Sequence, residues 1–461
     1  MNINNYLYAG LFRVLVLWAA GLGAPFMACF NVSERLGRGD GLSIDQCFWA
    51  ASWAKTEGRR CVSAKGRRRR ARKNGFHSTF KKTICRSRSM IKPSYPALST
   101  GEIYVPGLSA EHVAEKYGIA LNAISKLGSA ENPHGPSPKA LLAVREASEK
   151  ISLYPDWTAA KLRLAIGTKF GIDPENVVCG SGETEVISML IRAFAGPDEA
   201  VLMHNPCFPL YRIYSNCEGR KPIFVDMGAD FDPVMDQYIE ALKKHRPKIA
   251  FLTNPHNPSG RMVSEQDVIR VCEAAPPETL VALDEAYVHY TENPYGIGLL
   301  HRFPNLLVLR TLSKAYGLAG LRVGFGISAN RDLILPMRHI KPTWNMGQMQ
   351  IAGGIAGIDD DAHVARTVKT VVEMRAYVAQ RMQELAAFRM VPGSGANFFL
   401  TEIRDPRLDS TRVFNELLKR GVIVKDGSDI PGLGSRYLRV DVNLQEHMDR
   451  FVNALLDIQG H

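Results

Sequence analysis

The sequence predicts an α/β fold built on a parallel or mixed β-sheet with helices on both faces, followed by a smaller α+β domain. From about residue 140, short β-branched or leucine-rich runs alternate with amphipathic stretches. This order is typical of strands joined by helical crossovers. From about residue 336 the alternation gives way to one long helical pattern and then to strands without helices between them.

The apolar runs give the expected strands of the larger sheet. They are Val177–Cys179, Ala200–Met203, Pro222–Val225, Ile249–Thr253, Leu280–Leu283, Leu306–Arg310 and Arg322–Gly326. Helical stretches such as Glu185–Phe194 and Glu265–Ala274 separate them. In the smaller domain we expect a helix at Thr367–Ala387 and strands near Ala396–Leu400, Val422–Val424 and Tyr437–Val442.

The positive charge is confined to the first fifth of the chain. Residues 1–92 hold 18 Lys and Arg against 4 Asp and Glu, a net of +14, while residues 93–461 have a net of −3. The 461-residue chain is 46% hydrophobic and 22% charged, which suits a globular protein with a large core. A near-neutral body argues against a nucleic-acid-binding role for that body, and no nucleic-acid partner is expected.

The first 92 residues carry two signals of their own. GRRRRARK (Gly66–Lys73) is compatible with nucleic acid, a membrane surface or a targeting signal. Val14–Phe30 is an apolar run at the lower limit of a membrane span, without a basic segment before it. We favour a disordered extension, or translation from upstream of the true start at Met90. The body is then expected to fold and work without residues 1–89, and no membrane partner is expected.

We expect four regions along the chain: a basic extension (1–92), an N-terminal arm (93–135), a large domain (136–335) and a small domain (336–461). The eight cysteines form no C-x-x-C pair, and the body holds Cys179, Cys207, Cys217 and Cys272. Scattered cysteines in a body of this size indicate buried thiols in a reducing compartment, so a cytoplasmic location is expected.

The stretch RTLSKAYGLAGLR (Arg310–Arg322) is the strongest chemical signal. It places Lys314 on a loop at the carboxyl end of a predicted strand, where open α/β sheets bind ligands. No other charge occurs between Thr311 and Leu321, which weakens the alternative of a solvated surface lysine. The small residues that follow allow a cofactor close to the backbone, and Ser313 and Arg322 can share an anion.

Two further strands end in polar residues. Asp284 follows an apolar run in VALDEAYVHY (Val281–Tyr290), so it is expected to be buried and to need a partner. A protonated pyridine nitrogen or a metal would serve, although no histidine-rich spacing supports a metal and none is expected. Tyr287 can reach the same ligand. Asn257, in the turn LTNPHNPSG (Leu252–Gly260), can donate to a ligand oxygen, or the segment is a plain turn.

A fourth signal is CGSGETEVISMLIRAF (Cys179–Phe194), a strand, a glycine pair and a helix with an acidic first turn. The free N–H groups at such a helix start bind phosphate, although Glu183 and Glu185 also fit as residues that compensate the helix dipole. Taken together, the lysine, the buried aspartate, the asparagine and the helix start are the components of a pyridoxal phosphate site.

With these residues in place, the chain resembles fold-type I aminotransferases, and the histidinol-phosphate aminotransferase family in particular. The resemblance runs from about Tyr104 to Leu456. It is carried by YVPG (104–107), ENPHGPSP (131–138), YPD (154–156), LIRAF (190–194), NPHNPSG (254–260), DEAY (284–287), TLSKAYGLAGLRVG (311–324) and LRV (438–440). It implies a mostly parallel seven-stranded sheet in the large domain.

The resemblance also implies roles in catalysis. Lys314 would attach to the cofactor and later carry the proton, and Asp284 would keep the ring nitrogen protonated. Asn257 and Tyr287 would bond the ring's phenolic oxygen. Phe208 would stack on the ring, although core packing is the plainer interpretation of that residue.

Other implied contacts are to the cofactor phosphate and to the substrate. Ser313, Arg322 and the amides near Glu183 and Thr184 would hold the phosphate. Tyr154 would reach the phosphate of a neighbouring subunit, which implies a homodimer. Arg439, Tyr104 and Asn132 would contact the substrate, with Arg439 binding its acidic end. The implied reaction is amino transfer between L-histidinol phosphate and 2-oxoglutarate, a step of histidine biosynthesis.

Two departures from the family pattern fall where substrate is expected to bind. Ala130 replaces the usual asparagine before Glu131, and Lys425 stands where an arginine often occurs. Lysine keeps the charge but loses the bidentate fork. The sequence therefore leaves open an aromatic amino acid aminotransferase or a decarboxylase of a phosphorylated amino acid on the same scaffold.

Overall fold

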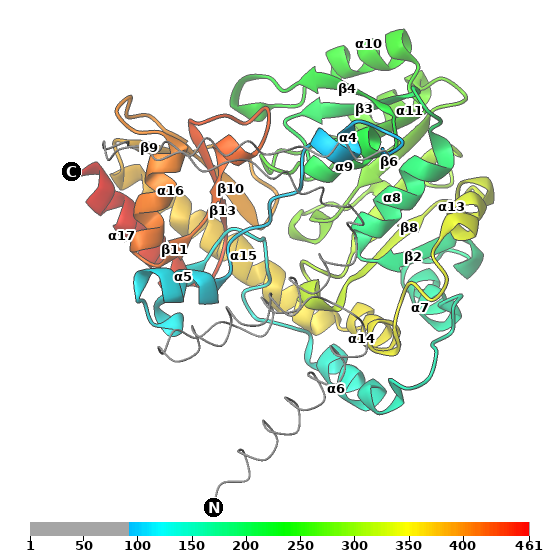
Figure 1. Cartoon of the computed structure of the whole chain (residues 1–461), viewed down its shortest axis with the longest axis horizontal. Helices are drawn as coiled ribbons and strands as arrows, with labels where there is room; N and C mark the ends of the chain where they lie inside the picture. Colours follow the sequence, from blue (N-terminus) through cyan, green and yellow to red (C-terminus); the bar gives the residue numbers. More distant parts are fainter. Residues whose placement is uncertain (1–91, 461) are drawn as a thin grey trace, which may run out of the picture. The chain divides into compact units, whose positions relative to one another are not determined.

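The expected strands form one seven-stranded sheet in the computed structural model, which describes residues 92–460 (Figure 1). The strands are β2 (Val177–Ser181), β3 (Ala200–Asn205), β4 (Lys221–Asp226), β5 (Ile249–Thr253), β6 (Leu280–Asp284), β7 (Leu306–Thr311) and β8 (Val323–Ile327). Their order is β2-β8-β7-β6-β5-β3-β4. β8 runs antiparallel to both neighbours, and the other adjacent pairs are parallel. The predicted mostly parallel sheet is confirmed.

The central strands are apolar except at their carboxyl ends, because the sheet is buried on both faces. In β7, Leu306 and Val308 pack into the core on one face, while Leu307 and Leu309 pack into the core on the other. All six residues of β7 are buried. Alternating side chains on a strand point to opposite faces, so a strand covered on both sides needs a continuous apolar run.

Helices cover the sheet and connect its strands. Their bounds are α6 (Pro138–Ala147), α7 (Ala160–Phe170), α8 (Glu183–Phe194), α9 (Pro209–Cys217), α10 (Met235–His245), α11 (Glu265–Ala274), α12 (Gly296–Leu299), α13 (Leu335–Ile340) and α14 (Gln348–Ile358). α13 packs against α8, and α14 packs against α6 and α7. Both therefore pack with the helices of the large sheet, although they follow the boundary expected at residue 335.

A second, smaller sheet has four strands. The antiparallel order is β12-β13-β10-β9, with β9 (Phe388–Met390), β10 (Phe398–Ile403), β12 (Lys425–Asp426) and β13 (Tyr437–Asp441). The helices α15 (Asp361–Arg381), α16 (Ser410–Lys419) and α17 (Gln445–Gln459) accompany it. Phe388, Phe398, Phe399 and Phe451 share its core. Figure 1 shows the long helix α15 between the two sheets.

The segment before α6 is tied to the small sheet. It contains the short helices α4 (Ala97–Thr100) and α5 (Ala110–Tyr117), and the strand β1 (Ser125–Lys126) pairs in parallel with β11 (Val422–Ile423). The expected strand Val422–Val424 corresponds to β11, and the next strand along the chain, β12, pairs instead with β13.

Several element boundaries differ from the sequence expectation: the long helix begins at Asp361 rather than at Thr367, and the strand expected at Ala396–Leu400 is β10. Two other differences have a physical reason. Arg322 was expected to open a strand, but its φ of 60° turns the chain before β8 begins at Val323. The long helix ends at Arg381 rather than at 387. Apolar residues continue at helical spacing beyond Arg381. The last of them, Phe388, begins β9 and pairs with Ile403 of β10. Periodicity alone did not separate that short strand from the helix.

The extension predicted for 1–92, including Val14–Phe30 and the arginine run, falls almost entirely on residues 1–91, which lie outside the described residues. Within residues 92–460, no helix has the length and apolar character that crossing a membrane requires. The four cysteines of this part are free, and all except Cys217 are buried.

A buried ion pair lies beside the end of β6. Arg310 on β7 contacts Glu285 at 2.6 Å, and the side chains are 6% and 0% exposed. We expect Arg310→Met to lower the free energy of unfolding by about 3 kcal/mol, because it leaves the Glu285 carboxylate buried without its cation. Chemical denaturation followed by circular dichroism measures this.

Arg302→Met is the matched control, because the Arg302–Glu273 pair has the same 2.6 Å separation but is about half exposed. Its loss should cost less than about 1 kcal/mol. Equal effects of the two substitutions would show that burial does not decide the strength of the Arg310–Glu285 pair.

Candidate active site

A cavity of about 460 Å³ opens at the carboxyl ends of the central strands. Thr253, Asp284 and Thr311 are the last residues of β5, β6 and β7, and all three line it. Parallel strands end at the same edge of a sheet, so residues far apart in sequence converge there. The loop after β7 adds Lys314, and the start of α8 adds Glu183 and Thr184.

The cavity brings together all but two of the thirteen residues predicted for the site. The eleven are Tyr104, Glu183, Thr184, Phe208, Asn257, Asp284, Tyr287, Ser313, Lys314, Arg322 and Arg439. Lys314 and Asp284 therefore face one cavity rather than separate ones, which a single cofactor bridging them requires.

Lys314 is held at the cavity wall without an acidic partner. Its Nζ donates to the backbone carbonyl of Ser129 at 3.1 Å and lies 5.4 Å from the centre of the Tyr287 ring. No ion pair involves Lys314 within residues 92–460. Removal from water, with the nearby Arg439 charge, lowers the pKa of Lys314 to about 8. Roughly a tenth of the amine is consequently neutral at pH 7, far more than for an ordinary lysine, and the neutral form is the nucleophile.

Asp284 is a carboxylate at the end of a buried strand and is 3% exposed. It accepts hydrogen bonds from the backbone N–H of Ala286 at 3.0 Å and from the hydroxyl of Tyr211. Burial raises the pKa of Asp284, and these two hydrogen bonds oppose that shift. A protonated ring nitrogen would give this carboxylate the cationic partner that it lacks within residues 92–460.

Tyr211 is the site residue that the sequence analysis missed. Its hydroxyl also lies 3.0 Å from the hydroxyl of Thr253, and its ring stacks on Phe251 with centroids 4.2 Å apart. The signal was available, since Tyr211 follows Phe208 at the spacing of one helical turn in α9. A pattern of core aromatics hides such a residue, because the sequence does not show where its hydroxyl points.

Donors for an anion gather where β2 passes into α8. Arg322 donates to the carbonyl of Ala319 at 3.1 Å and to the Thr184 hydroxyl at 3.3 Å. Its guanidinium lies over Gly182, where φ is +78° and a Cβ would stand 2.1 Å from Nη2. Glycine is therefore required for this approach. Ser313 lines the same end of the cavity. This donor set suits the phosphate of pyridoxal phosphate.

The opposite end of the cavity contains Arg439 on β13. Its guanidinium donates to the Asn257 side-chain oxygen at 3.1 Å and to the Gly128 carbonyl at 2.9 Å. Nε of Arg439 is buried and has no hydrogen-bond partner within residues 92–460. A guanidinium with a free donor in a cavity can accept an anionic ligand group.

A smaller cavity of about 260 Å³ continues from this end and shares Tyr104, Phe208, Asn257 and Arg439 with the first. The rings of Tyr104 and Phe208 meet edge to face with centroids 6.4 Å apart. Arg212 bonds Glu102 at 2.7 Å and so ties down the arm segment that carries Tyr104. Lys425 also faces this cavity, where it donates to the Val105 carbonyl and pairs with Asp429 at 3.1 Å.

Two predicted residues do not line the main cavity. Asn132, expected at the substrate, donates instead to the backbone carbonyl of Ala315 at 2.9 Å and to Thr367 at 3.1 Å. Its amide thereby holds the loop that carries Lys314. Tyr154 is 77% exposed and stacks on Trp344 with ring centroids 4.4 Å apart. Tyr154 therefore does not line the cavity of its own chain.

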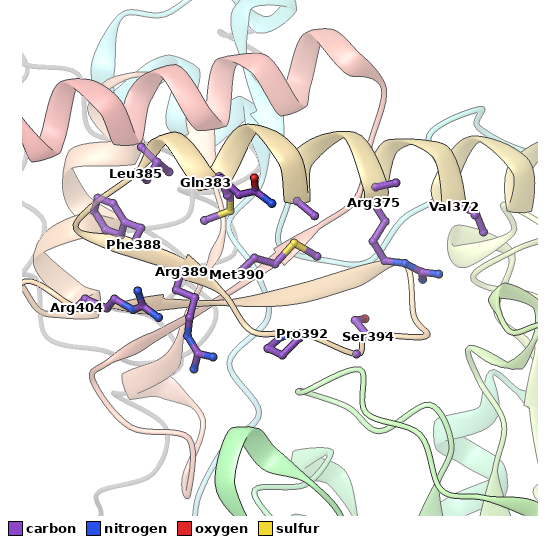
Figure 2. A pocket seen from close by; sticks show the side chains of 14 residues that line it. Val372, Arg375, Gln383, Leu385, Phe388, Arg389, Met390, Pro392, Ser394 and Arg404 are labelled. Atoms are coloured by element: carbon purple, nitrogen blue, oxygen red, sulfur yellow. The ribbon is translucent and has the colours of Figure 1, made fainter.

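A larger cavity, about 710 Å³, lies in the small domain between α15 and β9 (Figure 2). Figure 2 shows Arg375 on the helix side and Arg389 and Met390 on the strand side. Its charged groups are already engaged, since Arg389 pairs with Asp230 and Glu402, and Arg375 donates to the Ala396 carbonyl. The reactive groups described above all lie in the other cavity.

Comparison with known proteins gives a family and a set of relatives. The model of the family described as aminotransferase class I and II matches residues 123–455. The chain is 38% identical over 361 residues to a histidinol-phosphate aminotransferase of an Anaeromyxobacter species, covering 77% of this chain and 96% of that protein.

Solved structures share the fold. The histidinol-phosphate aminotransferase of Sinorhizobium meliloti, solved in complex with pyridoxal-5'-phosphate, superposes with a TM-score of 0.71 at 23% identity, covering 81% of this chain and 99% of that one. The L-threonine-O-3-phosphate decarboxylase of Porphyromonas gingivalis has a TM-score of 0.65 at 20% identity, covering 73% and 100%. At these identities the likeness establishes the architecture alone.

The lowered pKa of Lys314 predicts how the cofactor-free protein takes up pyridoxal phosphate. The rate of covalent attachment should rise about tenfold per pH unit below the pKa of about 8 and level off above it, because only the neutral amine attacks. Stopped-flow absorbance measures this rate.

Pyridoxamine phosphate, which has no aldehyde, is the control ligand and should bind without this pH dependence. The Lys314→Ala variant should show no covalent attachment at any pH. A rate that is still rising at pH 10 would show that Lys314 keeps an ordinary pKa.

Proposed function

The chain belongs to the class I and II aminotransferases and is a pyridoxal-phosphate-dependent transaminase; from this premise we propose that it moves an amino group between L-histidinol phosphate and 2-oxoglutarate. One observation carries the assignment of the site. Among the described residues, Lys314 has no acidic partner and the buried Asp284 has no cationic partner, and both face the same cavity of about 460 Å³. The name of the Anaeromyxobacter relative supports the choice of substrate.

The bound cofactor supplies an electron sink for the carbanion that forms when the substrate loses its α-proton. We assign Lys314 as the residue that attaches to the cofactor and, once released, removes and returns that proton. Its position beside the Ser129 carbonyl keeps the amine inside the cavity. We assign Asp284 the task of holding the proton on the ring nitrogen, which its strand-end position and burial support.

We assign the remaining cofactor contacts by where each residue lies along the cavity. Ser313, Thr184 and Arg322, with the backbone amide of Glu183, are assigned to the phosphate. Asn257 and Tyr287 are assigned to the phenolic oxygen of the ring. Phe208 is assigned to the ring face, which its position in the cavity wall and its edge contact with Tyr104 of the arm support.

We assign the substrate's anionic end to Arg439, whose buried Nε is free within residues 92–460. Lys425 contributes a second positive charge to the adjoining cavity of about 260 Å³. Tyr104, on the N-terminal arm, lines the same cavity. Asp429 pairs with Lys425, so a phosphate competes with a carboxylate for this lysine. The contact expected from Asn132 is assigned to positioning of the Lys314 loop instead.

We also propose a homodimer, supported by an exposed apolar patch made of Ile151, Leu153, Tyr154, Trp157 and Trp344. These side chains are between 45% and 77% exposed. A second copy that covers this patch would bring its Tyr154 to the phosphate site. Isolated apolar side chains are ordinary on a surface, whereas a gathered set of aromatics marks an interaction site. The free thiols of residues 92–460 support a cytoplasmic location.

A half-reaction screen tests the proposed reaction. Purified enzyme is mixed in turn with L-histidinol phosphate, phenylalanine, glutamate and phosphothreonine, and the cofactor spectrum is recorded. Histidinol phosphate and glutamate should convert the cofactor to its amine form, and Lys314→Ala should convert with neither.

The same screen separates the two alternatives. Conversion by phenylalanine with no response to histidinol phosphate would indicate an aromatic amino acid aminotransferase. Release of carbon dioxide from phosphothreonine would indicate a decarboxylase. Either result would replace the proposed substrate and leave the cofactor site as assigned.

The dimer is tested by sedimentation velocity. Leu153→Asp should shift the protein toward the monomer, because it places a charge within the apolar patch. Val372→Asp is the matched control, since Val372 is 44% exposed on α15, outside the patch. A wild-type protein that sediments as a monomer at all concentrations would contradict the proposal.

A further inference from the structure

Glu183 is a buried acid whose side chain has no task in the cofactor contacts assigned above, which use only its backbone amide. It is 8% exposed, begins α8 and lines the main cavity. Its Oε1 is buried and has no hydrogen-bond partner within residues 92–460. An unpaired carboxyl is costly to bury, so its presence in a ligand cavity requires an explanation.

The usual structural tasks of an acid in this position are done by other residues. Glu185, in the same helical turn, accepts the backbone N–H of Ser181 at 2.6 Å and the Asn345 amide at 2.6 Å. Glu183 makes no ion pair within residues 92–460. The cation nearest to this helix start, Arg322, directs its donors to Thr184 and Ala319. Glu183 is therefore neither the helix cap nor half of a salt bridge.

The backbone fixes where the Glu183 side chain begins. Gly324 on β8 lies so close that a Cβ there would be 2.1 Å from the Glu183 nitrogen and 2.5 Å from its Cα. Gly182, immediately before it, adopts a positive φ of 78°. The strand and the turn together hold the Glu183 backbone against the sheet, and Glu183 lines the same cavity as Asp284, the last residue of β6.

The neighbour that Glu183 meets there is Asp284. Burial and the Asp284 carboxylate raise the pKa of Glu183 well above its ordinary value. Burial raises the pKa of Asp284 as well, but a hydrogen bond with Glu183 opposes that rise. Two adjacent buried carboxyls cannot both be ionised at low cost, so one of them keeps a proton. Asp284 accepts hydrogen bonds from the Tyr211 hydroxyl and the Ala286 N–H, whereas Oε1 of Glu183 has no donor within residues 92–460, so the proton belongs on Glu183.

Other groups around the pair do not remove this need for a proton. The titratable and charged side chains that face it are Tyr211 from α9, Tyr287 after β6, and Lys314 and Arg322 from the segment after β7. Tyr211 donates to Asp284 and not to Glu183. The two cations lower the pKa of Glu183 less than burial and Asp284 raise it.

We propose that Glu183 carries the single proton of a Glu183–Asp284 carboxyl pair and donates it in a hydrogen bond that keeps Asp284 ionised for the ring nitrogen of pyridoxal phosphate. Glu183 is thus a positioning residue that acts through Asp284. This inference goes beyond the proposed reaction and rests on the assignment of the cavity to the cofactor.

Two substitutions of Glu183 test whether the donated hydrogen bond, rather than the carboxyl group itself, is what matters for cofactor binding. Glu183→Gln keeps a neutral donor of the same shape, and Glu183→Leu keeps the bulk without a donor. The dissociation constant of pyridoxal phosphate, measured by fluorescence titration of the cofactor-free protein, should change less than about threefold for Gln and rise about fivefold to tenfold for Leu. Equal affinities of the two variants would overturn the proposal.

The pH dependence gives a second readout. Deprotonation of Glu183 places a second carboxylate beside Asp284 and near the cofactor phosphate, so the wild type should bind more weakly than Glu183→Gln as pH rises above neutrality. Glu131→Gln, which removes another acid from the cavity wall, is the control and should follow the wild-type pH profile. Infrared difference spectra should show a protonated carboxyl band in the wild type that is absent from Glu183→Gln.

Failure of this inference is distinguishable from failure of the assigned site. If borohydride reduction does not trap the cofactor on Lys314, the site itself is wrong. If the cofactor is trapped there and the carboxyl band persists in Glu183→Gln, only the role of Glu183 is wrong. A Glu183→Leu variant that fails to fold leaves the infrared comparison of wild type and Glu183→Gln to decide.

Discussion

The site depends on one electrostatic constraint, a carboxylate placed at the end of a strand that is buried on both faces. Asp284 is 3% exposed, and the chain offers it hydrogen-bond donors but no ion pair within residues 92–460. Removing a carboxylate from water costs several kcal/mol unless it forms an ion pair with a cation. The cavity therefore suits a positively charged ligand atom, and we propose that the protonated nitrogen of pyridoxal phosphate provides it.

The same constraint explains how Lys314 stays reactive. A lysine close to an aspartate in a dry cavity would ordinarily pair with it and keep its proton. Here Nζ turns to the Ser129 carbonyl, and Arg439 adds a like charge that lowers the lysine pKa. The Asp284 carboxylate instead accepts hydrogen bonds from the Tyr211 hydroxyl and the Ala286 N–H. Separate partners thus keep the acid and the amine available to opposite ends of one ligand.

Much of this could be predicted from the sequence, because apolar runs and strand ends are local signals. The seven strands were found from continuous apolar runs, and the polar residues that follow them were found at the correct edge of the sheet. Contacts between distant segments were harder. The amide of Asn132 was expected at the substrate, yet it bonds the Ala315 carbonyl, and nothing in the ENP motif distinguishes these two partners. Tyr211 was missed because an aromatic ring at this position is expected in any buried core, and the sequence does not show that its hydroxyl reaches Asp284.

Glu183 shows how a local rule and a tertiary environment can conflict. An acid in the first turn of a helix is ordinarily favourable in its ionised form, because it compensates the helix dipole. That benefit is at most about 2 kcal/mol, and it applies to a charge that water can reach. At Glu183 the close approach of Gly324 holds the residue against the sheet, and burial beside Asp284 outweighs the dipole. The sequence shows an acidic helix start, whereas the fold turns one of its acids into a neutral hydrogen-bond donor.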